Sequence, residues 1–594
     1  AAGVSASIGT PGARPQAAYD RPERAAAAFD PQRGLGLLNG GEFAIRCRML
    51  NARPRWIVLA SFLCAVAPSS CSPGRDGNID SPGSVLPDLG APACFADSLR
   101  CSADQSTVQA CQGGRWTNQQ RCQGTDGQVC RGGRCVGPCD DLPAGSTGCS
   151  FYPVNLWSTS SSGELGIVAS NTSSTMEAVV TLEDVSGVIG TQTAPPGGLV
   201  VFRLDHGRNK LTRTEQARKG FHLKSSAPVA AYLFHPIDAA QVVTGSATLL
   251  LPEQVMAKDY FVMGYTYNAK IMTSVPQGQG FVAVLALADN TQVQLTVPVA
   301  TQAGAGIPAL AAGGTLQRTL NRMEVLEVTQ ATSLEDISGA VVKASANVVV
   351  FGGAGLVTVP SSALGGDHLG VQMFPLQTWG KHYAASKFKQ RNSTDRDYYR
   401  VLASVDSTQV TFTGGAGLPA VQTLRRGQFF EFDTDGDFEI TADQPILALQ
   451  YLPAWGNLSG TFKTSDFPQG APAGCPYTGN NVQCLGDANM SPLAPVEQYR
   501  SDYIFYVPQT YAYNYVNVTA PLDAALTLDG TAVSEPLRPL GSGVLGRAIL
   551  RVMPGNHRIS ADKPFGLLGY GYGYAISYCY PGGLNLQTIN PIPG

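Results

Sequence analysis

The sequence has few charged residues and no long apolar run. Asp, Glu, Lys and Arg make up 14% of the 594 residues, the formal net charge is −3, and the cations are scattered along the chain. Binding to nucleic acid or to an anionic membrane surface calls for clustered Lys and Arg, so the composition disfavours both partners. No apolar stretch approaches the roughly 20 residues of a transmembrane helix. We therefore expect contact with a membrane only through a lipid anchor.

The motifs of the commonest enzyme sites are also missing. The six histidines form no HExxH pattern and no pair at i, i+4, so the usual zinc-hydrolase ligands are absent from the sequence. There is no G-x-S-x-G elbow, P-loop or GxGxxG after a strand. We predict no catalytic residue, no metal and no cofactor. If the protein is an enzyme, His235 before Pro236, and His368 after Asp367, are the side chains to test, although histidines at strand ends are more often structural.

Two further groups of side chains are candidate ligand sites. The stretch DTDGDFE (433–439) alternates carboxylates as calcium loops do, but Phe438 stands where an EF-hand has glycine, and we favour a turn. Exposed aromatic residues could bind carbohydrate or peptide, but β-sandwiches commonly bury them, and we favour core positions. The aromatic residues are Trp379, Trp455, Tyr570, Tyr572 and Tyr574. Sequons begin at Asn171, Asn392, Asn457 and Asn517, where we expect no glycan.

The first 93 residues are expected to direct the chain without forming a core. Residues 1–48 are rich in Ala, Gly, Pro and Arg, and we expect disorder or an upstream extension there. Residues 49–70 are predicted to be a signal peptide, with Arg53 and Arg55 before the apolar run 57–67. Cleavage after Ala67 would give a secreted protein. We favour lipidation at Cys71, because PSSC resembles a bacterial lipobox, and hence a lipoprotein of the outer membrane or cell surface.

Cysteines dominate the next segments. Residues 71–93 are rich in Pro, Gly, Ser and Asp, which is typical of a flexible tether. Residues 94–138 have six cysteines among polar spacers and almost no aliphatic side chains, so cross-links must replace apolar burial. We predict three disulfides there, and the sequence does not determine which cysteines pair. A zinc site is disfavoured because the segment lacks paired CxxC spacing and histidine. The six are Cys94, Cys101, Cys111, Cys122, Cys130 and Cys135.

The remaining cysteines suggest two local loops. Cys139 and Cys149 are close enough in sequence to close one, and so are Cys475 and Cys484. Cys579 is then left over, either as a buried thiol or because the true pairing differs. An exported compartment, where disulfides persist, agrees with the predicted signal peptide.

Four similar stretches recur in the remainder of the chain. They are SAPVAAYLFHPI, SANVVVFGG, ADQPILALQYL and ADKPFGLLGYGYG, and they align on Pro228, Asn347, Pro445 and Pro564. Before each stretch lie two alternating runs that we predict to form a hairpin, then a second strand pair around a glycine turn. Pro-containing connectors with an aromatic strand separate the units. The 67 Gly and 40 Pro residues also favour short strands over long helices.

The repeats predict an all-β fold. Units of about 100–120 residues with six to eight short strands have the scale of a β-sandwich, and the recurring Pro and Asp residues are expected to serve the turns of the fold. We therefore predict tandem β-sandwich-like units after the disulfide-rich module, with a β-propeller-like arrangement as the alternative. The region is 139–594, with units at approximately 150–250, 251–365, 366–485 and 486–594.

The same residues carry a family resemblance. SSAPVAAYLFHPID, SATLLLPEQVMAKDYFVM, FVAVLALADNTQVQLTV, DHLGVQMFPLQTWGKHY, YRVLASVDSTQVTF and ADQPILALQYL, in this order, resemble the N-terminal domain of IgGFc-binding proteins. The resemblance implies an extracellular binding or adhesion module without catalysis. The von Willebrand-type repeats of the animal mucus member are not in this sequence. The lipobox and disulfide module resemble those of a Gram-negative, myxobacterial-type surface lipoprotein.

Three functions follow as hypotheses. The favoured one is a non-catalytic cell-surface protein that binds a glycoprotein, polysaccharide or protein ligand. The first alternative is an exported hydrolase with a site between β units. The second is a structural protein of an extracellular matrix.

Overall fold

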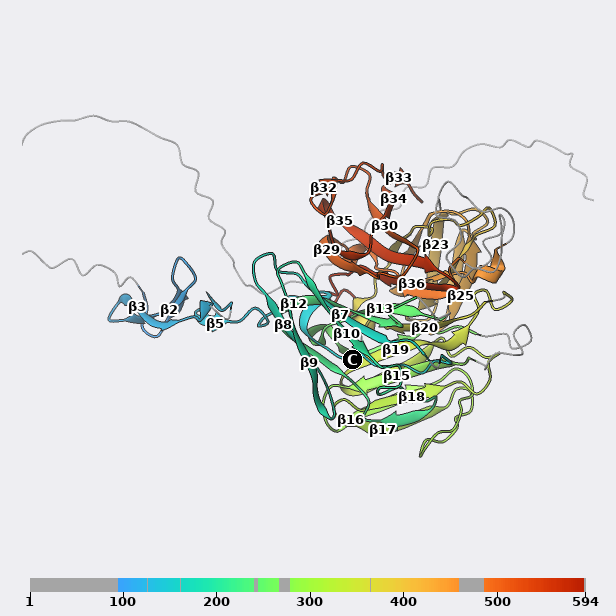
Figure 1. Ribbon diagram of the computed structural model, residues 1–594, viewed down its shortest axis with the longest axis horizontal. Helices are drawn as coiled ribbons and strands as arrows, with labels where there is room; N and C mark the ends of the chain where they lie inside the picture. Colours follow the sequence, from blue (N-terminus) through green and yellow to red (C-terminus); the bar gives the residue numbers. More distant parts are fainter. Residues whose placement is uncertain are drawn as a thin grey trace, which may run out of the picture. The chain divides into compact units, whose positions relative to one another are not determined.

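The computed structural model describes residues 94–591 except for 125–126, 161, 240–243, 267–277, 364 and 459–484. In these residues the chain consists of β-strands, turns and short 3-10 helices (Figure 1), and no helix is long and apolar enough to cross a bilayer. The predicted signal peptide and tether, the anchor Cys71, and the pair Cys475 and Cys484 lie outside the described residues.

The disulfide-rich module has a three-stranded and a two-stranded sheet. Its strands are β1 (Leu99–Cys101), β2 (Thr107–Gln112), β3 (Arg115–Arg121), β4 (Val129–Arg131) and β5 (Arg134–Val136). Its buried hydrophobic cluster is small and includes cystine sulfurs beside Val108, so the cross-links take the place of a core. The disulfides join Cys94 to Cys111, Cys101 to Cys130, and Cys122 to Cys135; a fourth joins Cys139 to Cys149.

Four units of β-strands follow the module. The first comprises β6 (Thr147–Phe151), β7 (Leu165–Asn171), β8 (Ala178–Asp184), β9 (Gly187–Ala194), β10 (Leu199–Leu204), β12 (His222–His235) and β13 (Ser246–Leu250). The second comprises β14 (Ala257–Val262), β15 (Gly280–Ala286), β16 (Thr291–Thr296), β17 (Thr315–Leu320), β18 (Val325–Thr329), β19 (Ala340–Val357) and β20 (Asp367–Gln372). The short β11 (Glu215–Ala217) pairs with β18 and links these two units.

The third and fourth units repeat this order. The third comprises β21 (His382–Ala385), β22 (Asp397–Ala403), β23 (Thr408–Gly414), β24 (Val421–Leu424), β25 (Phe429–Thr434), β26 (Phe438–Ala442), β27 (Ile446–Leu452) and β28 (Asn489–Pro492). The fourth comprises β29 (Arg500–Val507), β30 (Tyr513–Pro521), β31 (Leu526–Leu528), β32 (Thr531–Ala532), β33 (Arg538–Pro539), β34 (Leu545–Arg551), β35 (Gly555–Gly573) and β36 (Ile576–Pro581). Turns of 3-10 helix are η2 (Glu253–Val255), η3 (Leu376–Thr378), η4 (Trp455–Asn457) and η5 (Val496–Gln498).

In every unit one long strand joins two groups of strands, here called its two sheets; in the first, second and fourth units the two groups form one continuous hydrogen-bonded sheet, and in the third they are separate. The long strands are β12, β19 and β35, and in the third unit β26 and β27 are its two halves. The first half pairs with the first and third strands of the unit. The second half pairs with the second strand and with the last, which we call the inner strand (β13, β20, β28 and β36). The units are thus curled, sandwich-like β repeats, as predicted.

The recurring sequence motif marks the corner where the long strand changes sheets. Proline suits this position because the ladder is interrupted there and its missing N–H costs no hydrogen bond. Two residues earlier stands a Ser or Asp whose side chain accepts a hydrogen bond from a backbone N–H at the third strand of the unit. The four pairs are Ser226 with Val179, Ser345 with Gln292, Asp443 with Gln409, at 2.9 Å each, and Asp562 with Ala525 at 2.8 Å. The motif therefore serves the fold.

The predicted hairpin of the first two runs and the predicted pairing of the next two strands are both wrong. β7 pairs with β10 and β12, whereas β8 pairs with β9 and β12, so β7 and β8 are not partners. β9 and β10 likewise lie at opposite ends of the sheet order. The reason is that the long strand lies between them and pairs with each through a different half, so these turns carry the chain from one sheet to the other. Hairpins form instead between the third and fourth strands, as β8 and β9, and between the long strand and the inner strand, as β35 and β36.

The inner strands bring the four units together. β13 contacts β20 and β36, and β28 contacts the same two strands, so the contacts form a closed circuit. Asn489 Nδ2 donates to the carbonyl oxygens of Gly245 at 2.9 Å and Ser577 at 3.1 Å, and the backbone N–H of Gly245 donates to Asp367 Oδ1. All four units thus meet through hydrogen bonds at one place.

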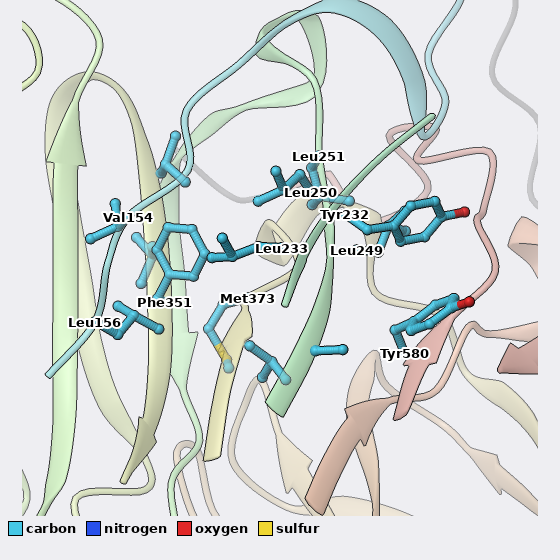
Figure 2. Close-up of a cluster of buried hydrophobic side chains, with 14 of the residues drawn as sticks. Val154, Leu156, Tyr232, Leu233, Leu249, Leu250, Leu251, Phe351, Met373 and Tyr580 are labelled. Carbon is cyan, nitrogen blue, oxygen red and sulfur yellow. The ribbon is translucent and has the colours of Figure 1, made fainter. Parts of the chain in front are cut away.

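The hydrophobic core continues across the units. One buried cluster contains side chains from all four of them. Figure 2 shows part of it, where Leu233 of the first unit lies beside Phe351 of the second, and Tyr232 lies near Tyr580 of the fourth. The two tyrosine rings are 4.8 Å apart, and the Tyr232 hydroxyl donates to the carbonyl of Ile504 at 2.8 Å. Because the core is shared, the units form one folded body.

Candidate functional site

One turn of each unit docks on the long-strand sheet of the preceding unit. Arg322, in the turn between β17 and β18, lies over the ring of Tyr152, with 5.8 Å from Cζ to the ring centroid. Arg426, in the turn between β24 and β25, lies over Phe261 at 4.8 Å. The turn before β34 places the backbone N–H of Ser542 2.9 Å from Glu439 Oε1. The same kind of contact joins the first unit to the fourth: Asn556 Nδ2 on β35 donates to the carbonyl of Gly197, in the turn between β9 and β10, at 2.7 Å.

The junction of the first and second units is filled by a polar network. His222 Nε2 lies 2.8 Å from Ser150 Oγ, and His222 Nδ1 lies 3.0 Å from Glu183 Oε1. The ring of Tyr152 stacks on His222 at 4.4 Å. Burial, which is the largest effect, lowers the pKa of His222, and Arg322 and Lys224 lower it further against the opposing effect of Glu183.

This network does not have the arrangement of a hydrolase triad. Ser150 Oγ donates its single proton to Glu253 Oε2 at 2.6 Å, so His222 Nε2 is left to donate to the serine oxygen. A general base must accept that proton instead. Glu253 also accepts from the Tyr152 hydroxyl at 3.2 Å. The contacts join side chains of two units, and we interpret them as an interface clamp.

The junction of the second and third units holds an open groove with a volume of about 550 Å³. Its floor is the outer face of the sheet around the first half of β19. Lys343 stands between Asp259 on β14 and Gln294 on β16, and Val341 is the neighbour of Thr296 in the adjacent row. Because alternate side chains of a strand share a face, these residues present one mixed polar surface to the groove.

Turns of the third unit form the facing wall. Ser404 and Val405 follow β22, Arg426 precedes β25, and Gln444 with Pro445 occupies the corner of the long strand. The approach of the two units is close: a Cβ atom at Gly339 would lie 2.4 Å from the carbonyl oxygen of Gly427. A side chain at Gly339 would therefore push the third unit away and change the groove.

The C-terminal segment completes one edge of the groove. Asn590 and Pro591 line it beside Leu376. Asn590 Nδ2 donates to the Leu376 carbonyl at 3.0 Å, and the backbone N–H groups of Ile589 and Asn590 donate to the carbonyl of Gln377 at 3.0 and 2.9 Å. A segment from the end of the chain is thus held against a 3-10 turn more than two hundred residues earlier.

The hollow at the junction of the third and fourth units is smaller, about 360 Å³, and its charges are paired. Arg547 Nε donates to Asp437 Oδ2 at 2.5 Å, and Lys387 Nζ donates to Asp397 Oδ1 at 3.1 Å. Side chains that neutralise one another offer a charged ligand little net attraction. The groove between the second and third units is therefore the better candidate binding site.

The structure brings together the histidines that the sequence singled out. The Nδ1 atoms of His235 and His368 are 3.3 Å apart, and Ser246 Oγ is 2.8 Å from His368 Nδ1. Both histidines are buried, and burial lowers the pKa of His235 well below 6.5 and that of His368 to about 3. A substrate cannot reach these side chains in the folded chain, so their role is in packing at the inner strands.

Asp367 lies in the same region but faces a carboxyl group. Burial raises its pKa well above 3.8, and nearby Asp487, itself raised by burial to a pKa of about 8, raises it further. Asp367 is the first residue of β20, and Asp487 lies two residues before β28. At neutral pH the pair retains a proton, because two buried like charges oppose one another.

The acidic stretch 433–439 is occupied by ion pairs. Arg396 contacts Asp433 and, at 3.5 Å, Asp435. Asp437 pairs with Arg547, and Glu439 lies 2.7 Å from His382 Nε2. No group of three or more potential metal ligands occurs in the part of the chain that the structure describes.

The other singled-out side chains lie mainly in the core. Trp379, Tyr570 and Tyr572 are buried, whereas Trp455 and Tyr574 are half-buried. Asn171, Asn392 and Asn517 are buried, and Asn457 is half-buried. Cys579 is a buried thiol, 3.2 Å from Asn489 Oδ1. The aromatic residues therefore support the core and form no exposed platform.

Comparison with known proteins agrees with the resemblance of the repeated motifs. Residues 246–571 match the family described as IgGFc binding protein. The chain belongs to this family. The match to the IgGFc-binding family runs from the start of β13 into β35 and contains the floor and facing wall of the groove.

Two further comparisons add little. No curated protein matches the chain. A solved structure, that of a single-residue mutant of the major pilin from Streptococcus pyogenes, is 9% identical, with 74% of this chain and 99% of the pilin chain covered and a TM-score of 0.12. A likeness with so low a TM-score carries no argument about the fold.

Sequence reasoning did not single out Lys343, Gln294 and Arg426 as groove residues. They are widely separated in sequence and meet only because one unit docks on the next. One signal was available: Arg322 and Arg426 occupy the same turn in successive repeats, so an alignment of the repeats can find this contact position.

Proposed function

We propose that the protein is a non-catalytic extracellular binding protein whose ligand contacts the groove between its second and third units. The family match carries the proposal, because it covers the floor and the facing wall of this groove. The four disulfides support an oxidising, extracytoplasmic compartment. The groove has the volume of an ordinary ligand site.

A surface location is part of this proposal. The lipobox cysteine Cys71 and the polar segment 71–93 would anchor the chain and hold its β-region away from an outer membrane. In a bacterial host, Cys71→Ala should abolish labelling with palmitate and release the protein into the medium. Retention of the label in this variant would contradict lipidation at Cys71.

A panel of binding measurements tests which class of ligand the protein recognises. The family description names antibody Fc, so purified Fc belongs in the panel beside mucin-type glycoproteins and polysaccharides. Saturable binding of the full exported chain to one of these, measured by surface plasmon resonance, is the expected result. Absence of binding to every member, with normal adhesion of a deletion strain, would contradict the proposal.

A groove-filling variant locates the site. Thr296→Trp places a large side chain in the groove, whereas Val188→Trp adds the same ring to an exposed position on β9 of the first unit, away from the groove. Only the first should block the ligand found in the panel. Equal binding by both variants would move the site elsewhere on the protein.

A further inference from the structure

Two cationic side chains line the groove between the second and third units. Lys343 and Arg426 line it, and neither side chain has a hydrogen bond or ion pair with any other described residue. Asp259 is the single carboxylate among the described lining residues, and it neighbours Lys343 across the strand pair β14 and β19. Among the lining side chains one negative charge faces two positive ones, so the lining itself has a net positive charge. The carboxylate of Asp406 lies just outside the lining, where it accepts a hydrogen bond from the backbone N–H of Arg426 at 3.0 Å.

The side chain of Arg426 is oriented to bind an oxyanion. Its guanidinium lies 4.8 Å above the ring of Phe261, so stacking restricts its orientation while leaving its N–H groups at the edge of the plane. A guanidinium matches carboxylate and other oxyanions by paired hydrogen bonds. Because the Arg426 side chain is already restricted, less conformational entropy is lost when a ligand binds.

The remaining polar lining suits hydroxyl groups. Gln294, Gln444 and Asn590 bring amides and Thr296 brings a hydroxyl, groups that can both donate and accept hydrogen bonds. The Ser404 hydroxyl also lines the groove, but it donates its proton to the Pro445 carbonyl at 2.6 Å and is left as an acceptor. The described lining contains no aromatic ring, so stacking on a neutral sugar is not available. We propose that the groove binds an acidic sugar unit, with its carboxylate or sulfate at Arg426 and Lys343 and its hydroxyls at the amides. This inference rests on the proposed binding function and specifies the ligand's chemistry.

The test uses the full exported chain and three oligosaccharides. A hyaluronan tetrasaccharide supplies carboxylates, a sulfated galactan oligosaccharide supplies sulfates, and chitotetraose is neutral. Isothermal titration should detect one or both acidic oligosaccharides and no chitotetraose. Because exposed charges are screened by salt, the affinity should fall when the ionic strength is raised.

Matched variants identify the side chains. Arg426→Gln should weaken binding at least about tenfold, the usual scale for loss of a charge-assisted hydrogen bond, and Lys343→Gln should weaken it in the same direction. Arg425→Gln removes the neighbouring exposed arginine, which does not line the groove, and should leave the affinity within about twofold. Asp259→Asn removes the opposing charge and should strengthen binding. Thermal unfolding of each variant shows that it is folded.

The following results would overturn the inference that the groove binds an acidic sugar. Equal binding of acidic and neutral sugars, or equal effects of the Arg426 and Arg425 substitutions, overturns it. Failure of all three sugars to bind, while the chain still binds a protein of the panel, overturns the acidic-sugar inference and leaves the proposed function standing. Failure of both sugars and proteins overturns the two together.

Discussion

Asp443 accepts a hydrogen bond from the backbone N–H of Gln409 at 2.9 Å, at the corner where the long strand of the third unit changes sheets. Asp443→Ala should lower the free energy of unfolding by about 0.5–1.5 kcal/mol, because it removes one partly solvated hydrogen bond. Urea unfolding of the intact chain measures this change.

The repeats themselves supply the control. Ser226 and Ser345 make the corresponding contact in the first and second units, so Asp443→Ser should retain most of the stability lost in Asp443→Ala. If the serine and alanine variants are equally unstable, the side-chain acceptor is not what the motif provides.

Arg400 joins the second and third units and should be a strong determinant of stability. Its buried guanidinium contacts Asp336 at 2.8 Å and Glu431 at 2.7 Å, and it donates to the Gly264 carbonyl at 3.0 Å. Arg400→Leu should cost about 3–5 kcal/mol, because it leaves partly buried carboxylates without their cation.

The matched substitution Arg396→Leu removes a more exposed arginine that contacts Asp433. Exposed pairs contribute about 1 kcal/mol or less, so denaturant unfolding should separate the two variants clearly. Similar losses in both would show that the junction of the units does not depend on Arg400.

The buried histidines should make the fold sensitive to acid. Well above pH 6.5, His368 is neutral in both the folded and unfolded chains and contributes no pH dependence. Below pH 6.5 the unfolded chain binds a proton, but the folded chain does so only near pH 3, because burial lowers the pKa of His368 to about 3. Stability should therefore fall as the pH falls through this window, by up to about 1.4 kcal/mol per pH unit for this group.

Comparison of pH 7.5 with pH 5.0 tests this sign. His368→Gln cannot take up the proton, so its loss of unfolding free energy between the two pH values should be about 2 kcal/mol smaller than that of the unmodified chain. His557→Gln, at a half-buried position on β35, serves as the control. A pH dependence that is unchanged in His368→Gln would contradict the assignment.

The disulfide-rich module should lose its order independently of the four units. The Cys101–Cys130 bridge spans 29 residues and crosses between the two small sheets. Replacing both cysteines with serine should destabilise the module by about 2–4 kcal/mol, since the unfolded segment regains conformational freedom.

Hydrogen exchange with peptide resolution measures this effect. Exchange should accelerate in residues 99–136 and stay unchanged in β15, β22 and β30. Faster exchange throughout the chain would show instead that the module supports the β-units.

The repeating unit could be predicted from the sequence because the corner of the long strand needs a particular type of residue at one position. Pro228, Pro445 and Pro564 mark the same backbone position in three units, and Asn347 marks it in the second. The choice of strand partners was not accessible: the runs around β7 and β8 alternate as hairpin strands do, yet the long strand lies between them. Alternation specifies which face a residue occupies and does not specify its neighbour across the sheet.

The candidate site escaped prediction for a related reason. His235 and His368 attracted attention by residue type, but their burial follows from the meeting of inner strands. Lys343 and Arg426 look like ordinary surface cations in the sequence, and their shared groove depends on how one repeat docks on the next. The docking of one repeat on the next depends on the complementary shapes of surfaces built from many residues, and no short sequence motif predicts these shapes.

The contact between Ser146 and Leu584 has a consequence for biogenesis. The backbone N–H of Ser146 donates to the Leu584 carbonyl at 3.0 Å, and the Leu584 N–H donates to Ser146 Oγ at 3.2 Å. The two residues are 438 positions apart in sequence. During synthesis the segment before β6 therefore cannot make these hydrogen bonds until Leu584 has been added, so the first unit is completed only after most of the other three have been made.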